Sequence, residues 1–176
     1  WKAYNEVIGS SMPNLEELHR SAQEYPGTKM QELADITWAD GQVLSASRNY
    51  LYNRVAAKAA LERAGNVYLS ILGGTKEETM QDRAHLGLAR VHEMRGDLEQ
   101  ARQEYLAVQG GYSAYAKEQA ERLAKPESKD TYAWLEKAVP PRVPTAVGPG
   151  TPGKKPEFSA TELTLPEETA APSGPS

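Results

Sequence analysis

Histidines are the side chains in this sequence best suited to metal chemistry, but their spacing does not favour a metal centre. His85 and His92 lie seven residues apart on one predicted helix, which puts them on the same side but about 10 Å apart along the axis. One metal ion bound at about 2 Å from each ring nitrogen is hard to fit to that separation. His19 is remote in sequence. We therefore predict no metal site and interpret the histidines as surface or packing residues.

Paired carboxylates offer little for acid–base catalysis. The pairs are adjacent, at positions 16–17, 77–78 and 167–168, so the two side chains of a pair point in different directions on a helix. The first two pairs fit the opening turn of a helix, where negative charge is favourable. The sequence contains no phosphate-binding glycine loop after a strand, no G-x-S-x-G elbow and no cysteine. We therefore expect a protein that is not an enzyme and that uses no cofactor.

Two stretches 37 residues apart carry the same pattern of leucine, alanine, tyrosine and an aliphatic residue. They are Leu61, Ala64, Tyr68 and Ile71, followed by Leu98, Ala101, Tyr105 and Val108. Spacings of three and four put each set on one face of a helix. A repeat of this length is typical of helical solenoids, which hold other proteins. Both tyrosines are then core residues, and we expect the same of Trp38 and Trp134.

Proline divides the chain into a helical part and a tail. Nine of the twelve prolines lie between residues 140 and 175, and with four glycines they prevent regular structure there. We predict an all-α domain over residues 1–139 and a disordered tail over residues 140–176. The expected helices lie near 2–8, 14–24, 29–46, 54–72, 76–94, 97–109, 113–124 and 128–138.

Helix starts and one internal glycine add detail to this prediction. The expected capping boxes begin at Asn14, Thr28, Thr75 and Asp97, each with a glutamate or glutamine three residues later. Gly65 lies inside a predicted helix, where it costs about 1 kcal/mol relative to alanine. We therefore expect a neighbouring backbone to approach closely at this position.

Net charge and hydropathy argue against two kinds of association, with nucleic acid and through a membrane-spanning helix. A formal net charge of −4 gives no reason to expect binding to nucleic acid. The sequence contains no run of about 18 apolar residues, so it predicts no membrane span. The chain opens on Trp1 rather than Met, which indicates a processed chain or a fragment, and any membrane anchor would lie upstream.

The predicted helices 76–94 and 97–109 resemble a tetratricopeptide repeat (TPR). The positions that carry the motif are Leu88, Ala89, Gly96, Ala101, Tyr105 and Val108. His92 replaces an aromatic residue of the motif and Ser113 replaces its usual proline. The order of segments over roughly residues 13–139 also looks like the bacterial cell-envelope TPR proteins related to the ancillary subunit of the Sec translocon.

This resemblance implies a short TPR-like solenoid of helical hairpins with flanking capping helices. It also implies one N-terminal membrane anchor and a repeat domain on the extracytoplasmic side of the inner membrane that binds client or partner proteins. A cytoplasmic location is the alternative.

The resemblance further implies a concave surface lined by the first helix of each pair. The candidate partner-binding residues on it are Leu33, Ile36, Asp40, Val43, Leu44, Arg83, Leu86, Arg90, Glu93 and Met94. Charged and aliphatic residues together suit an extended or helical peptide laid in a groove. The alternative is that the aliphatic residues are core and the charges form a solvated helix face.

Three functions remain open at this point. The leading hypothesis is a non-enzymatic protein–protein interaction module, with scaffold, chaperone-like or assembly duties. A structural subunit of a larger or self-associated assembly is the alternative, and an enzyme of unrecognised type comes third. Phe158, Leu163 and Leu165 form one candidate docking element in the tail, although composition favours a simple spacer there.

Overall fold

Residues 14–139, which the computed structural model describes, form seven α-helices joined by turns, with no β-strand among them. The helices are α2 (Leu15–Ala22), α3 (Lys29–Asn49), α4 (Arg54–Gly74), α5 (Glu78–Arg95), α6 (Leu98–Ala107), α7 (Ser113–Ala124) and α8 (Pro126–Lys137). The predicted all-α fold is confirmed for this part of the chain. The expected helix at 2–8, the predicted tail at 140–176 and its Phe158 element lie outside the described residues.

Local hydrogen bonds explain where several helices begin and end. The side chains of Asn14, Thr28 and Asn53 each accept a bond from the backbone N–H three residues later, at 3.2, 3.2 and 3.1 Å. Such caps satisfy an N–H group that has no partner inside the helix. Gly96 ends α5 in the left-handed conformation, with φ of +84°, which glycine adopts at little cost.

The cap predicted at Thr75 is wrong, and Asp97 is the N-cap of α6 as predicted but lacks the side-chain bond of a capping box. Helix α5 begins at Glu78 with Glu77 as its N-cap, and neither Glu77 nor Asp97 makes a capping bond through its side chain. The Thr75 hydroxyl accepts a bond from the Glu77 N–H at 3.3 Å, rather than from Glu78, and donates to Glu32 at 3.3 Å, which ties the α4–α5 turn to α3. The Asp97 carboxylate lies 3.6 Å from His92 and 3.5 Å from Arg95. In both cases partners in neighbouring turns compete successfully with the capping position.

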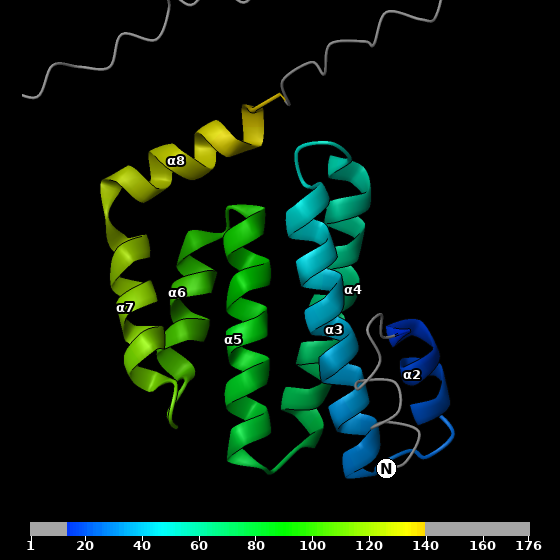
Figure 1. Cartoon of the computed structure of the whole chain (residues 1–176). Helices are drawn as coiled ribbons and strands as arrows, with labels where there is room; N and C mark the ends of the chain where they lie inside the picture. Colours follow the sequence, from blue (N-terminus) through cyan, green and yellow to red (C-terminus); the bar gives the residue numbers. More distant parts are fainter. Residues whose placement is uncertain (1–13, 140–176) are drawn as a thin grey trace, which may run out of the picture. The chain divides into compact units, whose positions relative to one another are not determined.

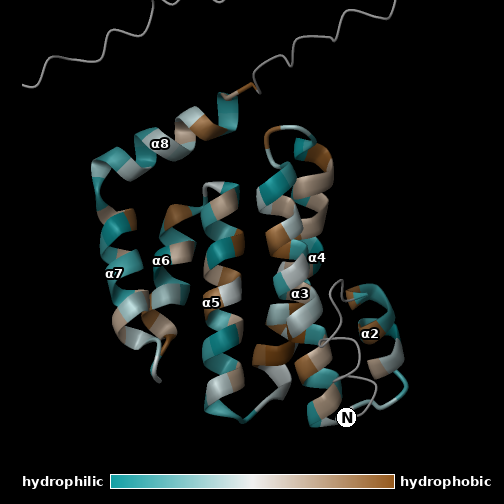
Figure 2. Cartoon of the chain, viewed as in Figure 1, coloured by the Kyte–Doolittle hydropathy of each residue, from teal (hydrophilic) through white to brown (hydrophobic). Residues whose placement is uncertain are grey.

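Neighbours in sequence pack against one another along most of the chain (Figure 1). Helix α2 packs on α3, and each helix from α3 to α6 packs on the next one, ending with α6 on α7. Helix α3 also contacts α5. Helix α8 runs across one end of these helices (Figure 1). In Figure 2 hydrophobic segments recur between hydrophilic ones along α3, α4 and α5, as expected for helices that bury part of their surface.

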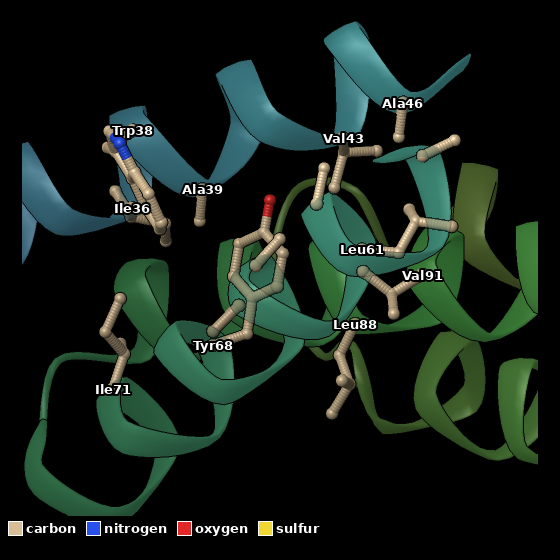
Figure 3. Packing of buried hydrophobic residues seen from close by; sticks show 14 of the residues in the cluster. Ile36, Trp38, Ala39, Val43, Ala46, Leu61, Tyr68, Ile71, Leu88 and Val91 are labelled. Atoms are coloured by element: carbon tan, nitrogen blue, oxygen red, sulfur yellow. The ribbon is translucent and has the colours of Figure 1, made fainter. Parts of the chain in front are cut away.

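The core consists of one large cluster, one smaller neighbour and a third small cluster that joins α2 to α3 through Leu18, Ala22 and Ala34. The large cluster joins α3, α4 and α5, with Tyr68 at its centre and Trp38 at one side (Figure 3). The smaller cluster joins α5, α6 and α7 around Tyr105. Tyr68, Tyr105 and Trp38 are 0%, 2% and 6% exposed, which confirms their prediction as core residues.

Trp134 is the exception, and its prediction as a core residue is wrong. Its side chain is 65% exposed, and α8 contains no buried residue. Tyr132 and Leu135 are the residues of α8 that pack against the two clusters. Trp134 lies between them in sequence and therefore on a different side of the helix.

The close approach expected at Gly65 occurs instead at Gly87, on the facing helix α5. A Cβ atom at Gly87 would lie under 3.0 Å from three atoms of the Tyr68 ring, whereas one at Gly65 would lie 3.6 Å from the nearest atom, on Val91. The second distance is ordinary van der Waals contact. The Tyr68 ring therefore packs directly on the α5 backbone, and Gly87 is the residue that makes this possible.

No helix within residues 14–139 has the length and hydropathy needed to cross a membrane.

Candidate functional site

A groove with a volume of about 850 Å³ lies between α3, α5 and the start of α7. Five of the ten residues predicted to meet a partner line it: Leu33, Asp40, Arg83, Leu86 and Arg90. The other residues that line it are Glu77, Thr79, Met80, Tyr112 and Tyr115. The structure thus brings together residues from α3 and α5 that are about 45 positions apart in sequence, as a surface shared by two hairpins requires.

The remaining predicted residues lie elsewhere. Ile36 and Val43 are buried in the large cluster, because α3 packs against α2, α4 and α5 at once. Leu44 is exposed on α3, outside the groove lining. Glu93 and Met94 line a smaller hollow of about 240 Å³, which shares Arg90 and Tyr115 with the groove.

Asp40 is the best-connected charge in the groove. Its Oδ1 accepts a hydrogen bond from the Tyr68 hydroxyl at 2.6 Å. Its Oδ2 accepts two bonds from Arg83, at 2.6 Å from Nη2 and 3.0 Å from Nε. This carboxylate therefore links α4 and α5 to α3 and neutralises Arg83. Charge-assisted bonds of this kind are among the strongest in proteins.

Glu93 makes a similar set of bonds at the next junction. It accepts a bond from the Tyr105 hydroxyl at 2.9 Å and one from Arg122 Nη2 at 2.6 Å. The Tyr132 hydroxyl of α8 also donates to it. At both junctions, then, a core tyrosine reaches through the helix packing to a carboxylate that is also held by an arginine of a later helix.

The tyrosine hydroxyls at these junctions stay protonated over the physiological range. Burial raises the pKa of Tyr68 and that of Tyr105 well above 10, and the adjacent carboxylate raises each further. Burial and the bond to Glu93 raise the pKa of Tyr132 to about 12. All three phenols therefore act as hydrogen-bond donors at neutral pH.

Among the charged side chains that line the groove, Arg90 is the cation without a carboxylate partner within residues 14–139. Glu77 pairs with Lys29 at 2.9 Å, and Arg83 is paired with Asp40. Arg90 lies beside the Tyr115 hydroxyl and forms no ion pair with a carboxylate of residues 14–139. Tyr112 and Tyr115 are exposed next to it. The groove thus presents one cation and two aromatic rings to solvent above an aliphatic floor.

The tyrosines of the groove were not among the predicted site residues. The prediction considered only the first helix of each repeat pair, while Tyr112 and Tyr115 belong to the turn before α7 and to its first residues. Their spacing of three, directly after Gly110-Gly111, is the sequence signal that could have indicated them.

Asp82 fixes the turn that carries these tyrosines. It is 5% exposed and accepts bonds from the backbone N–H groups of Gln109 at 2.9 Å and Gly110 at 2.7 Å. A Cβ atom at Gly110 would lie under 3.0 Å from this carboxylate. The buried carboxylate of α5 thus positions one wall of the groove.

Each histidine has a carboxylate neighbour. His19 Nδ1 lies 2.8 Å from Asp35, and the His19 ring stacks on Trp38 at 4.5 Å, which ties α2 to α3. His85 Nδ1 lies 2.7 Å from Glu104 and ties α5 to α6. Within residues 14–139 no three histidine or carboxylate side chains gather as a metal site would require.

Comparison with protein-family models, with curated proteins and with solved structures gave no match in any of the three.

Proposed function

We propose that this protein is a non-enzymatic interaction module, built as a short TPR-like solenoid, that binds a segment of another protein in the groove between α3, α5 and α7. The observation that carries the proposal is the composition of the groove, in which Arg90, Tyr112 and Tyr115 stand at the rim and Leu33, Met80 and Leu86 supply apolar contact. Arginine and tyrosine are the residue types that contribute most to binding energy at protein interfaces.

The packing of the helices supports the solenoid part of the proposal. Antiparallel neighbours follow one another from α3 to α7, and α3 contacts α5 across the hairpins. The alanine and tyrosine pattern found in sequence lies inside the packing, with Ala64, Tyr68, Ala101 and Tyr105 all buried. Small residues that admit a neighbouring helix and large ones that fill the next gap are what stacked hairpins need.

The charges in the groove indicate which partner segments fit. Asp40 and Glu77 already form ion pairs with other side chains. A bound segment can therefore form its ion pair with Arg90. A segment with a carboxylate beside an apolar side chain satisfies both Arg90 and the aliphatic floor.

Affinity capture with the full chain as bait tests the proposal. Arg90→Glu and Tyr112→Ala change exposed groove residues that lie outside the core clusters. Leu69→Ala is the matched control, because Leu69 is 55% exposed on α4, outside the groove. We expect one polypeptide to be retained by the unmodified chain and by the control, and to be reduced at least about tenfold with either groove variant. Equal recovery with all four baits would exclude the groove as the binding surface.

A structural role in a self-associated assembly is the second candidate. It is favoured by large apolar side chains exposed outside the groove, with Val55 at 83%, Leu106 at 56% and Trp134 at 65%. Light scattering over a wide concentration range separates the two functions. A strictly monomeric species at the highest concentration would argue against self-assembly.

We further propose that the module works in the bacterial cell envelope, on the extracytoplasmic side of the inner membrane, tethered through a segment upstream of Trp1. The support for this location is the resemblance of the segment order to cell-envelope TPR proteins. Fractionation of cells that express the natural protein tests it, and recovery in the cytoplasmic fraction would contradict it.

A further inference from the structure

Helix α8 makes fewer buried contacts with the rest of the protein than the other described helices do. It is the only one of the seven without a buried residue, whereas α4 and α5 each bury seven or more. Its closest backbone neighbour is α7, the helix that precedes it in sequence. Much of its hold therefore comes from single side chains rather than from a packed face.

The start of α8 has the geometry of a hinge. One extended residue, Lys125 with φ of −72° and ψ of +142°, separates it from α7. Pro126 follows as the first residue of α8, where its missing N–H costs nothing. One side-chain bond braces this joint, from the Ser128 hydroxyl to the carbonyl of Arg122 at 2.7 Å. Two backbone bonds accompany it, from the Lys125 N–H to Arg122 at 3.2 Å and from the Ser128 N–H to Lys125 at 3.1 Å.

The far end of α8 is fastened by one arginine from a distant part of the chain. Arg54 Nη2 donates to the carbonyl oxygens of Leu135 at 3.1 Å and Ala138 at 2.8 Å. These carbonyls lie at the C-terminal end of α8, where a cation is favourable. Arg54 is also the first residue of α4, where its charge is unfavourable to its own helix. The fastening therefore satisfies a charge that α4 alone would not stabilise.

Between these two ends α8 spans a hollow. The space has a volume of about 480 Å³ and has a mixed lining. Tyr50, Met94 and Leu98 line it on the body side together with charged Arg95 and Asp97, and Tyr132 and Leu135 line it on the α8 side together with charged Lys129 and Glu136. The Tyr132 hydroxyl donates to Glu93, and Leu135 packs against the large cluster. A helix that rests on a few contacts over a cavity gains less from burial than one that packs along its length.

From these observations we propose that α8 is a hinged strap. It opens about Lys125 as one unit, while α3 to α7 remain folded, and it thereby controls exposure of the mixed surface at Tyr50, Met94 and Leu98 and the charged residues beside them. The closed state depends on the Arg54 fastening and on the Tyr132–Glu93 bond. Sub-global opening of this kind is expected where few apolar contacts hold an element.

Native-state amide hydrogen exchange on the full chain, read out by mass spectrometry, tests the strap. We expect amides of residues 129–138 to exchange at least about tenfold faster than those of α4 and α5, with little dependence on low urea concentrations. Arg54→Ala removes two hydrogen bonds from a charged donor, so it should accelerate α8 by about tenfold or more while α5 stays within about twofold.

Two further variants complete the test. Tyr132→Phe loosens the strap without changing α4, so it should also accelerate exchange in α8 alone. Arg63→Ala is the matched control on α4, because Arg63 bonds to Gln42 of α3 at 2.9 Å rather than to α8, and it should leave α8 unchanged. Equal exchange of α8 and α5 in the unmodified chain, or equal acceleration of both by Arg54→Ala and Tyr132→Phe, would overturn the proposal.

Discussion

The contact between the Tyr68 ring and the α5 backbone predicts that replacing glycine by alanine destabilises the protein at Gly87 but stabilises it at Gly65. Gly87→Ala and Gly65→Ala both add a methyl group in the middle of a helix, on α5 and α4 respectively. At Gly87 the new Cβ would overlap three atoms of the Tyr68 ring, whereas at Gly65 it would make ordinary contact with Val91. The two variants therefore separate helix propensity from packing.

The magnitudes follow from the surroundings of each glycine. In both variants alanine favours the helix by about 1 kcal/mol relative to glycine. Gly87→Ala also strains a core in which Tyr68 is 0% exposed, at about 1–3 kcal/mol. Moving the ring weakens its bond to Asp40, at about 1.5–3 kcal/mol for a charged acceptor. We expect a net destabilisation of about 1.5–5 kcal/mol for Gly87→Ala and a stabilisation of about 0.5–1 kcal/mol for Gly65→Ala.

Thermal unfolding followed by circular dichroism, with urea titration alongside, measures both effects. A domain of this size changes its melting temperature by about 3–5 °C per kcal/mol, so Gly87→Ala should melt about 10 °C lower and Gly65→Ala a few degrees higher. In the double variant Gly87→Ala/Tyr68→Leu the smaller side chain relieves the overlap, so the two changes should cost less together than their sum. Stabilisation by Gly87→Ala, or strictly additive costs in the double variant, would refute the packing of Tyr68 on Gly87.

Three further predictions concern the polar groups that join the helices. Tyr68→Phe removes one of the donors to Asp40 and should lower the free energy of unfolding by about 2 kcal/mol, so an unchanged urea midpoint would contradict the role of this bond. Asp82→Ala leaves two backbone N–H groups of the α6–α7 turn without their acceptor and should cost about 2–3 kcal/mol in the same assay, whereas Asp82→Asn, which keeps one acceptor oxygen, should cost less. Burial raises the pKa of both Tyr68 and Tyr105 in the folded protein. Above pH 10 the two phenols therefore lose their protons in the unfolded chain but keep them in the folded one. The free energy of unfolding should be unaffected by these groups below pH 10 and should fall above it by about 2.7 kcal/mol per pH unit for the two together. Urea midpoints between pH 9 and 11, with phenolate absorbance as a second signal, check this, and titration of both phenols near pH 10 in the folded protein would be incompatible with it.

Sequence was sufficient to predict most helices and the centre of the core. The helical periodicity around Tyr68 and Tyr105 depends on residues three or four positions apart, and so do the N-caps at Asn14 and Thr28. Local spacing in the sequence is therefore enough to predict these features. The wrong cap at Thr75 and the missing capping bond at Asp97 have a different cause, because the groups that compete for these side chains are Glu32 on α3 and residues at the end of α5.

The face that a helix buries was harder to predict than the helix itself. Trp134 was expected in the core, but the side of α8 that meets the body depends on Arg54, 81 positions from Leu135 in sequence. Ile36 was expected at the surface of the groove, but α3 is covered by three neighbours. Both depend on tertiary packing, which a hydrophobic pattern in one segment does not specify.

The candidate site could be predicted in part. Aligning the two hairpins was enough to indicate Asp40, Arg83 and Arg90, because these residues lie on the helices that the repeat pattern selects. Tyr112 and Tyr115 were missed because their place in the groove depends on the turn that Asp82 holds, and that bond connects positions 27 and 28 residues apart.

The two tyrosine–carboxylate–arginine junctions limit how far this chain can vary by exchange of its hairpins. Tyr68 and Tyr105 each bond to an acid on the preceding helix of their own hairpin, Asp40 in the middle of α3 and Glu93 near the end of α5. A duplicated, deleted or transplanted hairpin would keep its own tyrosine–carboxylate pair but would lose the arginine that the following helix supplies, and so leave a partly buried carboxylate without its cation. Each hairpin is therefore specific for the helix that follows it, so the order of the hairpins along the chain matters to the fold as much as their number.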